Sequence, residues 1–417
     1  MLLVVSLAAT GGCREAATGA TVLRLATTQS GERMREPFRA ALRAFEAAHP
    51  GVRVEHLESD DDVYQKMGLV TLFVGGSPPD IYFQWGGYQV RKWAAAGYAL
   101  DLTGEFPSSE RARYLPVCWP SATGWDGRIY LWPDTASLTT VFWYRRSVFE
   151  RLGLRPPPTW PGFLALCGRL KQAGMNPLAV GNRELWGGGN FAAYLIAQHA
   201  GTETYNRVLD LEPGTCLDDP RFVAGLEIAA DLVRRGFLNQ GVSGVGTDEA
   251  RALLLQRRAG MHPIGDWLVT DAGEADAGDL DAFLLPHLPG QAGVDRTLLA
   301  LSTGYMIYRR TPHPDLARAL LRHLTSDAVQ RDWARHGHVS ALRAAAPGPD
   351  APPGQRRMSE FLRTAAATAL APDVGFNLEV SDAFLDAASL VLGGRAAAAA
   401  ALSGAEQQVA ALRRARK

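Results

Sequence analysis

Apolar and polar positions alternate in short runs near the start of the chain, and longer stretches with helical spacing separate these runs. Strands are predicted at Val22–Thr27, Val52–Leu57 and Ile81–Gln84, from their alternation and their β-branched or aromatic content. Helices are predicted between them, one opened by Pro37 and closed before His49, and one over Val63–Val74. Three strands alternating with two helices over about 70 residues predict a parallel α/β sheet.

The stretch from Gly127 to Trp160 organises the middle of the chain. A strand is predicted at Arg128–Trp132, followed by Pro133, which has no N–H to donate and is expected to stop strand pairing. A second strand is predicted at Leu138–Tyr144, before a short helix and a run of three prolines. Two strands joined by an irregular segment indicate a crossing between two lobes, and its Trp132 and Asp134 suit the wall of a cleft.

The remaining patterns repeat strands and amphipathic helices and indicate a second α/β lobe. Two proline-marked segments, Pro286–Gly293 and Ala345–Pro353, are further candidate crossings. The other predicted strands are Met175–Gly181, Gly260–Trp267, Ala282–Pro286 and Leu298–Tyr308. The other predicted helices are Tyr88–Ala96, Thr159–Gly174, Phe191–Ala200, Pro220–Arg235, Thr247–Arg258, Leu316–Leu324, Ser326–Trp333, Arg356–Leu370, Ser381–Leu392 and a last one from Ser403.

Composition narrows the classes of function. The 417 residues carry 43 basic and 43 acidic side chains, so no basic excess points to nucleic acid as a partner. Ten tryptophans provide core bulk and also flat apolar faces that suit the C–H faces of sugars. No P-loop, H-E-x-x-H, C-x-x-C or nucleophile elbow is present, so a catalytic function has no motif to support it.

The N-terminus reads as an export signal. An apolar run, Leu2–Ala9, leads through small residues to Cys13, which is typical of a lipoprotein signal whose cysteine is lipidated. The run has no basic residue before it, and Thr10 stands where such signals usually carry an aliphatic residue. A plain cleaved signal, or an apolar N-terminus without significance, is the alternative. Residues 1–20 are assigned to this region, and no other stretch is apolar enough to span a bilayer.

Residues that follow the strands are the first candidates for a binding site. Ligands of open α/β sheets lie beyond the carboxyl ends of the strands. Gln29 and Ser30 follow the first strand, and Gln84 and Trp85 end the third. Helix capping or a turn is the alternative role for Gln29 and Ser30.

Several motifs, taken in order, resemble one known family. The chain contains F-x-x-x-H-P-G-V-x-V at 45–54, G-x-P-P-D-I at 76–81, G-x-x-Y-x-x-P at 127–133, L-K-x-A-G-x-x-P-L-A-x-G at 170–181 and G-D-W at 265–267. Together they resemble the extracellular solute-binding proteins of bacterial ABC importers, in the sugar-binding branch. The resemblance covers most of the chain after the signal region.

The resemblance implies a fold, an activity and partners. It implies an α/β, two-lobed periplasmic-binding-protein fold of type II, with the ligand cleft between lobes joined by hinge crossings. The N-lobe would comprise 21–133 and 293–342, and the C-lobe 134–292 and 343–417. A monomer outside the cytoplasm, anchored if Cys13 is lipidated, would bind a disaccharide or oligosaccharide and deliver it to ABC permease subunits, without a metal or cofactor. The implied ligand contacts are Gln29, Ser30, Gln84, Trp85, Trp132, Asp134, Trp186, Asn190, Asp266, Trp267, Tyr305 and Phe376.

Trp267 is the strongest of these candidates, because the family's tryptophan at this position stacks on sugar. No arginine or lysine can be assigned near it from the sequence, which argues against a charged carboxylate or phosphate ligand. A secreted glycoside-processing enzyme using carboxylates such as Asp134 and Asp266 stays open, as does a binding protein that reports sugar to a sensor kinase.

The three cysteines after the N-terminal region are expected to be buried free thiols, with a Cys167–Cys216 disulfide as the alternative. Their spacing fits no metal motif. His336 and His338 lie near a predicted helix end without neighbouring carboxylates, so a metal site there is not expected.

Overall fold

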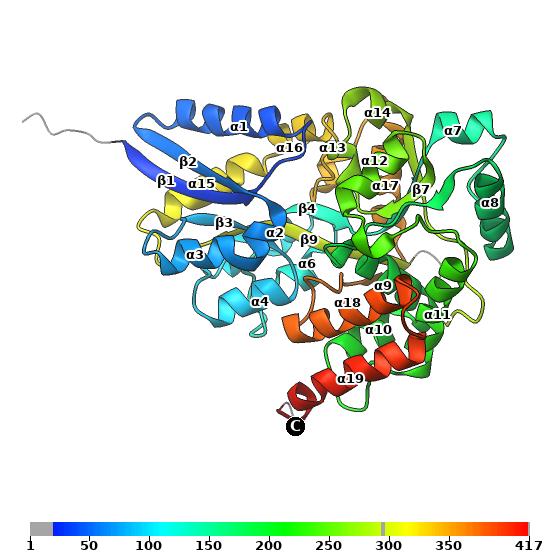
Figure 1. The fold of residues 1–417 in the computed structure, drawn as a ribbon. Helices are drawn as coiled ribbons and strands as arrows, with labels where there is room; N and C mark the ends of the chain where they lie inside the picture. The colour runs from blue at the N-terminus through cyan, green and yellow to red at the C-terminus, as the bar shows by residue number, and fades with distance from the viewer. Residues whose placement is uncertain (1–19, 293–296, 416–417) are drawn as a thin grey trace, which may run out of the picture.

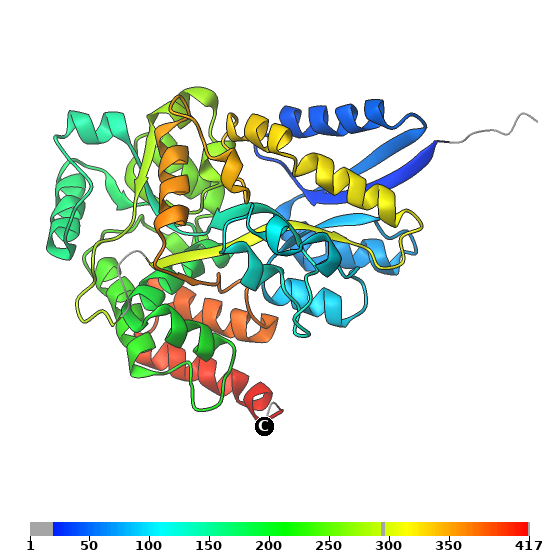
Figure 2. The ribbon, with the colours of Figure 1, turned by 180° about the vertical axis from the view of Figure 1, so that it is seen from behind.

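The computed structural model describes residues 20–292 and 297–415 and shows two α/β lobes, each built on its own sheet (Figures 1 and 2). Cys13 lies outside the described residues. Within the described part of the chain, no helix is both long and apolar enough to cross a membrane. The two-lobed architecture expected from the sequence is confirmed.

The first lobe contains a six-stranded sheet in which β10-β9-β3-β1-β2 are neighbours and β4 also pairs with β9. β1 pairs in parallel with β2 and β3, as the strand–helix alternation predicted, whereas β9 runs antiparallel to β3 and β4. The strands are β1 (Thr21–Thr28), β2 (Val52–Ser59), β3 (Ile81–Trp85), β4 (Trp132–Leu138), β9 (Thr297–Ile307) and β10 (Ala367–Ala369).

Helices cover both faces of this sheet. One face carries α1 (Arg35–Ala48), α15 (Pro314–Leu324) and α16 (Asp327–Ala334), with α1 above the strands in Figure 1 and α15 behind them. α1 buries Phe38, Leu42 and Phe45 as its pattern predicted. The opposite face is covered by α3 (Leu69–Val74), α4 (Tyr88–Ala95) and α6 (Cys118–Ala122), and short α2 (Asp61–Val63) runs through a π-helical turn at Tyr64–Gly68 into α3. α5 (Ser108–Arg111) precedes α6.

The second lobe contains a four-stranded sheet in the order β6-β7-β5-β8. Its strands are β5 (Val141–Arg145), β6 (Asn176–Leu178), β7 (Ala259–Ile264) and β8 (Leu280–Phe283). The helices around it are α7 (Arg146–Arg151), α8 (Trp160–Gln172), α9 (Trp186–Ala200), α10 (Thr202–Leu209), α11 (Pro220–Arg234), α12 (Thr247–Leu255), α13 (Leu268–Asp271), α14 (Glu274–Asp279), α17 (Pro353–Thr364), α18 (Leu378–Leu392) and α19 (Ala398–Ala415).

Several local predictions were wrong. The strand predicted at Arg128–Trp132 is not formed, because β4 begins at Trp132 and only an isolated bridge at Ile129 precedes it. Pro133 lies inside β4 and does not stop it: β9 is the only named strand that pairs with β4, and the register shifts between Pro133 and Thr135. The helix predicted at Phe191–Ala200 begins at Trp186, so the glycines after Trp186 form the first turn of α9. A Cβ on Gly189 would lie 2.0 Å from the side chain of Leu385, so small residues are required here for packing of α9 on α18.

The chain crosses from one lobe to the other after β4, after β8 and after α16. β10, which belongs to the stretch assigned to the C-lobe, pairs in parallel with β9 of the six-stranded sheet. The lobe boundaries stated above stay a prediction.

The three described cysteines are free thiols. Cys118 and Cys167 are buried, and burial raises the pKa of the Cys118 thiol to about 12. Cys216 is only partly buried, so the expectation of a buried thiol holds for two of the three.

Candidate binding site between the lobes

A cavity of about 360 Å³ lies between the two sheets and receives side chains from both lobes. Its volume is within the range of roughly 300–1,000 Å³ that is common for small-molecule sites. Nine of the predicted contact residues line it, namely Gln29, Ser30, Trp85, Asp134, Trp186, Asn190, Asp266, Trp267 and Tyr305. The fold therefore brings these residues together from positions more than 270 residues apart in the chain. Whether they contact a ligand stays a prediction.

Gln84 and Trp132 do not line the cavity, which corrects their assignment. Gln84 lies between two lining residues of β3 and points to the other face of the sheet, because successive strand residues alternate. Its Oε1 accepts a hydrogen bond from the backbone N–H of Trp85. Trp132 is buried in the first lobe, where its Nε1 donates to Thr325 Oγ1 at 2.9 Å.

Phe376 also lies away from the cavity. It is fully buried in the second lobe, and its ring meets that of Tyr205 edge-on, with centroids 6.0 Å apart. The same loop reaches the cavity three residues earlier, through Asp373.

Two indole rings form an aromatic corner in the second lobe. The ring centroids of Trp186 and Trp267 are 5.8 Å apart and the rings are tilted by 59°. Trp186 begins α9, and Trp267 follows β7 directly before α13. The Trp267 indole lies against the backbone of Gly265, where a Cβ would come within 1.9 Å of the ring. Glycine at 265 therefore sets the position of this indole.

Asp266 connects the end of β7 to β4 inside the cavity wall. Its carboxylate accepts hydrogen bonds from Ser137 Oγ at 3.0 Å and from the backbone N–H of Leu138 at 3.2 Å. Only 4% of Asp266 is exposed, and this burial raises the pKa of its carboxyl to about 7. Asp266 therefore holds the cavity wall together as well as facing the cavity.

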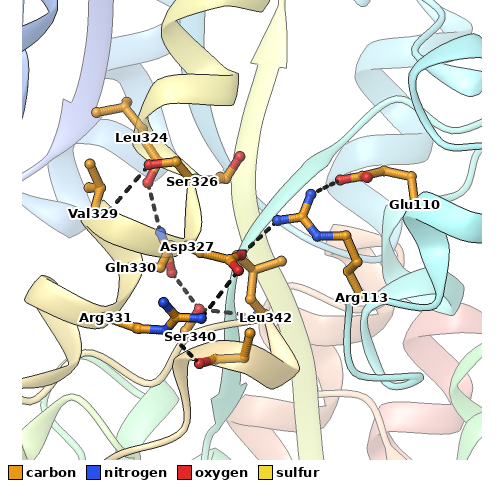
Figure 3. A network of polar contacts seen from close by, with 12 residues as sticks. Glu110, Arg113, Leu324, Ser326, Asp327, Val329, Gln330, Arg331, Ser340 and Leu342 are labelled. Carbon is orange, nitrogen blue, oxygen red and sulfur yellow. Dashed lines mark hydrogen bonds and ion pairs between the residues drawn. The ribbon is translucent and has the colours of Figure 1, made fainter.

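Asp134 is anchored to the segment that follows α16. Its Oδ1 accepts a hydrogen bond from Gln330 Nε2 at 2.7 Å and lies 3.8 Å from His338 Nε2. Figure 3 shows Gln330 reaching both Leu324 and Ser340, while Asp327 of the same helix pairs with Arg113. This network attaches the chain after α16, which leads to the second lobe, to the cavity wall of the first.

Known proteins share this architecture. A family model described as bacterial extracellular solute-binding protein matches residues 26–331, which is well over half of the chain. The chain belongs to this family.

Individual relatives are distant. An uncharacterized ABC transporter extracellular-binding protein of Pyrococcus horikoshii is 24% identical over 86% of this chain and 79% of its own length. A probable sugar-binding periplasmic protein of Rhizobium meliloti is also 24% identical, over 50% of this chain and 49% of its own. The solved structure of the bacterial solute receptor AcbH, described as preferring β-D-galactopyranose, is 17% identical, with a TM-score of 0.83 over 94% of this chain and 100% of that one.

Several residues of this solute-binding protein's cavity were missed from the sequence. Thr135, Ser137 and Thr139 line it at every second position of β4 and just beyond it, a polar alternation that the sequence contains. Arg251 of α12 also lines it, and it forms ion pairs with Asp271 at 2.8 Å and with Asp248. No local signal in α12 identifies Arg251, because its partner Asp271 comes from another element.

The two lobes of the solute-binding protein touch at one rim of the cavity. The loop after β1 meets α13, where the backbone N–H of Arg33 donates to Thr270 O at 3.0 Å. A Cβ on Gly31 would lie 2.7 Å from Asp271 Oδ1, so the loop approaches α13 closely because residue 31 has no side chain. This rim of the cavity is closed by direct contact between the lobes.

The raised pKa of Asp266 predicts a pH dependence of stability. The folded protein keeps a proton on this carboxyl up to about pH 7, whereas the unfolded chain releases it near the ordinary aspartate pKa of 3.8. The stability contributed by the neutral carboxyl is therefore present below about pH 4 and is lost as the pH rises through about 7. Asp266→Asn should remove this loss, because an amide can accept from Leu138 N–H and donate to Ser137 Oγ.

The measurement is the free energy of unfolding of ligand-free protein in urea at several pH values. The stability of Asp266→Asn relative to wild type should rise with pH, by up to about 1.4 kcal/mol per pH unit between about pH 4 and pH 7. A constant difference across that range would show that Asp266 is already ionised in the folded protein at low pH.

Proposed function

We propose that this protein is the extracytoplasmic substrate-binding component of an ABC importer and that it binds a disaccharide or oligosaccharide between its lobes. The observation that carries the proposal is the aromatic corner of Trp186 and Trp267 in a cavity otherwise rich in polar side chains. Indole faces suit the C–H faces of pyranose rings, and hydroxyl, amide and carboxylate groups suit their hydroxyls.

The relatives support a sugar as the solute. One matching protein is described as sugar-binding and one as a receptor with a galactopyranose preference, on the same fold. The proposal places the protein as a monomer outside the cytoplasm, anchored through Cys13 if that residue is lipidated. Its partners are the sugar and the permease subunits that receive it when the lobes close around the ligand.

The test is intrinsic tryptophan fluorescence and thermal shift against a panel of monosaccharides and oligosaccharides, with amino acids and phosphate as controls. A saturable response to one class of sugar, with that sugar recovered unchanged by chromatography, is the expected result. Conversion of the sugar would instead favour a glycoside-processing enzyme. A response only to amino acids or phosphate would overturn the proposal.

A further inference from the structure

The described side chains that line the cavity are strongly acidic. They include seven aspartates and a single arginine, Arg251, whose charge is already paired with Asp271 and Asp248. Other lining aspartates have neutral donors as close partners, such as Ser137 for Asp266 and Gln330 for Asp134. Burial raises the pKa of Asp266 to about 7 and those of Asp61, Asp271 and Asp373 to about 6, so these last three are still largely ionised at pH 7. The described lining side chains therefore carry more negative than positive charge at this pH. The seven are Asp61, Asp62, Asp134, Asp248, Asp266, Asp271 and Asp373.

A second, independent observation concerns buried atoms without partners. Asn190 is 2% exposed and is a neighbour of the Asp373 carboxyl. Both Asn190 Oδ1 and Asp373 Oδ1 are buried and have no hydrogen-bond partner in the protein. Each lines the cavity and is an acceptor that needs a donor.

His262 adds a third acceptor. Its Nδ1 lies 2.7 Å from the carbonyl of Ala179, so this nitrogen carries the proton that is donated to the carbonyl. Burial lowers the pKa of His262 to about 4, so the ring is neutral at pH 7 and Nε2 has only a lone pair. His262 is 1% exposed, lines the cavity, and its Nε2 has no partner.

The chemistry of these atoms selects the kind of group that complements them. A hydroxyl offers one donor and also brings lone pairs that need donors, whereas an ammonium offers three donors, no acceptor and a positive charge. Two further buried atoms at the cavity have no partner, Thr247 Oγ1 and His338 Nε2, and the hydroxyl can accept as well as donate. Asn190 Oδ1, Asp373 Oδ1 and the His262 Nε2 lone pair can only accept, so in a cavity with more negative than positive charge they match an ammonium better than a hydroxyl. The aromatic corner of Trp186 and Trp267 still provides the flat faces that suit a sugar ring.

We propose that the carbohydrate bound in this cavity carries a free, protonated amine, so that the substrate class is amino sugars and not neutral sugars. This inference rests on the proposed function, which it narrows. The lining carboxylates, with Asn190 and His262, hold the ammonium, and the indoles hold the ring.

The experiment compares sugars that differ at one substituent. Calorimetric titrations at pH 7 would use glucose and galactose, their β-1,4-linked disaccharides, the 2-amino-2-deoxy form of each, and the N-acetyl form of each, with spermidine as a cation without a sugar ring. The amine form should bind at least tenfold more tightly than both its hydroxyl and N-acetyl counterparts. Its affinity should also fall as the salt concentration rises.

The alternative outcomes separate this inference from the function on which it rests. Equal or tighter binding of the neutral forms would overturn the amine assignment and leave sugar binding intact. Binding of spermidine as tightly as the amino sugars would overturn recognition of the ring. Absence of binding by every sugar in the set would overturn both proposals.

A variant tests the charge directly. Asp373→Asn keeps the size of the side chain and removes its charge. It should lower the affinity for the amino sugar more than tenfold. It should change the affinity for the N-acetyl form by less than threefold. Asp61→Asn, which removes the charge of another lining carboxyl, is a second variant for the case that Asp373→Asn does not fold. Asp315→Asn, on the exposed surface of α15, is the control and should change neither affinity. Equal losses for both sugars would show that Asp373 only positions Asn190, and would overturn its role as a counter-charge.

Discussion

Replacement of Trp267 by alanine is expected to lower the affinity for sugar more than tenfold, which is about 1.4 kcal/mol or more. Trp267 forms one wall of the aromatic corner, with its ring centroid 5.8 Å from that of Trp186. Removal of the indole takes away the apolar face on which a pyranose ring would stack and leaves Trp186 alone. The affinity is measured by calorimetric titration with the sugar that the panel identifies.

The control for this variant is Trp125→Ala, because Trp125 is 59% exposed and does not line the cavity. It should bind sugar as the wild type does. Unchanged affinity of Trp267→Ala would remove Trp267 from the site and with it the main support for stacking.

Gly265→Ala is expected to displace the same indole without removing it. The new methyl group would lie 1.9 Å from the Trp267 ring, so the ring has to move. A loss of affinity close to that of Trp267→Ala is expected, while Gly273→Ala, where a Cβ meets nothing within 4 Å, should have no effect. Equal sugar affinities of Gly265→Ala and Gly273→Ala would show that the position of the Trp267 indole does not affect sugar binding.

Replacement of Gln330 by alanine is expected to lower the free energy of unfolding by about 3 kcal/mol or more. Gln330 is fully buried and donates to Asp134 Oδ1 at 2.7 Å. It also donates to Leu324 O at 3.0 Å and accepts from Ser340 Oγ (Figure 3). Without it, the buried Asp134 carboxylate and the Ser340 hydroxyl lose partners, and a cavity opens between α16 and β4. Urea unfolding, followed by tryptophan fluorescence, measures the change.

Two further variants separate the causes of that loss. Gln330→Met keeps most of the volume and removes the hydrogen bonds, so it should retain most of the destabilisation if the unpaired polar groups dominate. Gln408→Ala, at an exposed position of α19, should change stability by less than about 0.5 kcal/mol. A small effect of Gln330→Ala would show that water replaces the amide in this network.

Local patterns predicted much of the fold because the period of the side chains is a local property. The three strands before residue 86 and the helices between them were predicted together with their parallel pairing, which the structure confirms. Residues at strand ends, such as Gln29 and Trp85, were placed at the site because strand ends converge at one edge of a sheet. Trp267 was placed there by the resemblance to the family. The order of the family's motifs was used to predict which segments of the chain form each lobe.

Other residues were misplaced because their role depends on a partner from a distant segment. Gln84 shares its strand end with Trp85, but the direction of each side chain depends on which face of β3 the second lobe covers. Trp132 is of a residue type that often lines binding clefts, but its indole N–H donates a hydrogen bond to Thr325 inside the first lobe. Pro133 was predicted to stop strand pairing, although β4 includes it, with a shift of register against β9 directly after it.

The sequence by itself determined the class of fold, the family and nine of the residues that line the cavity, because apolar periodicity and the order of motifs are properties of the linear sequence. Only the tertiary structure decided the character of that cavity. The charges of Asp61, Asp248, Asp271 and Asp373 are scattered over more than 300 positions and become one acidic surface only when the lobes come together. Whether an acceptor such as Asn190 Oδ1 is satisfied depends on all its neighbours in space, and no stretch of sequence contains them.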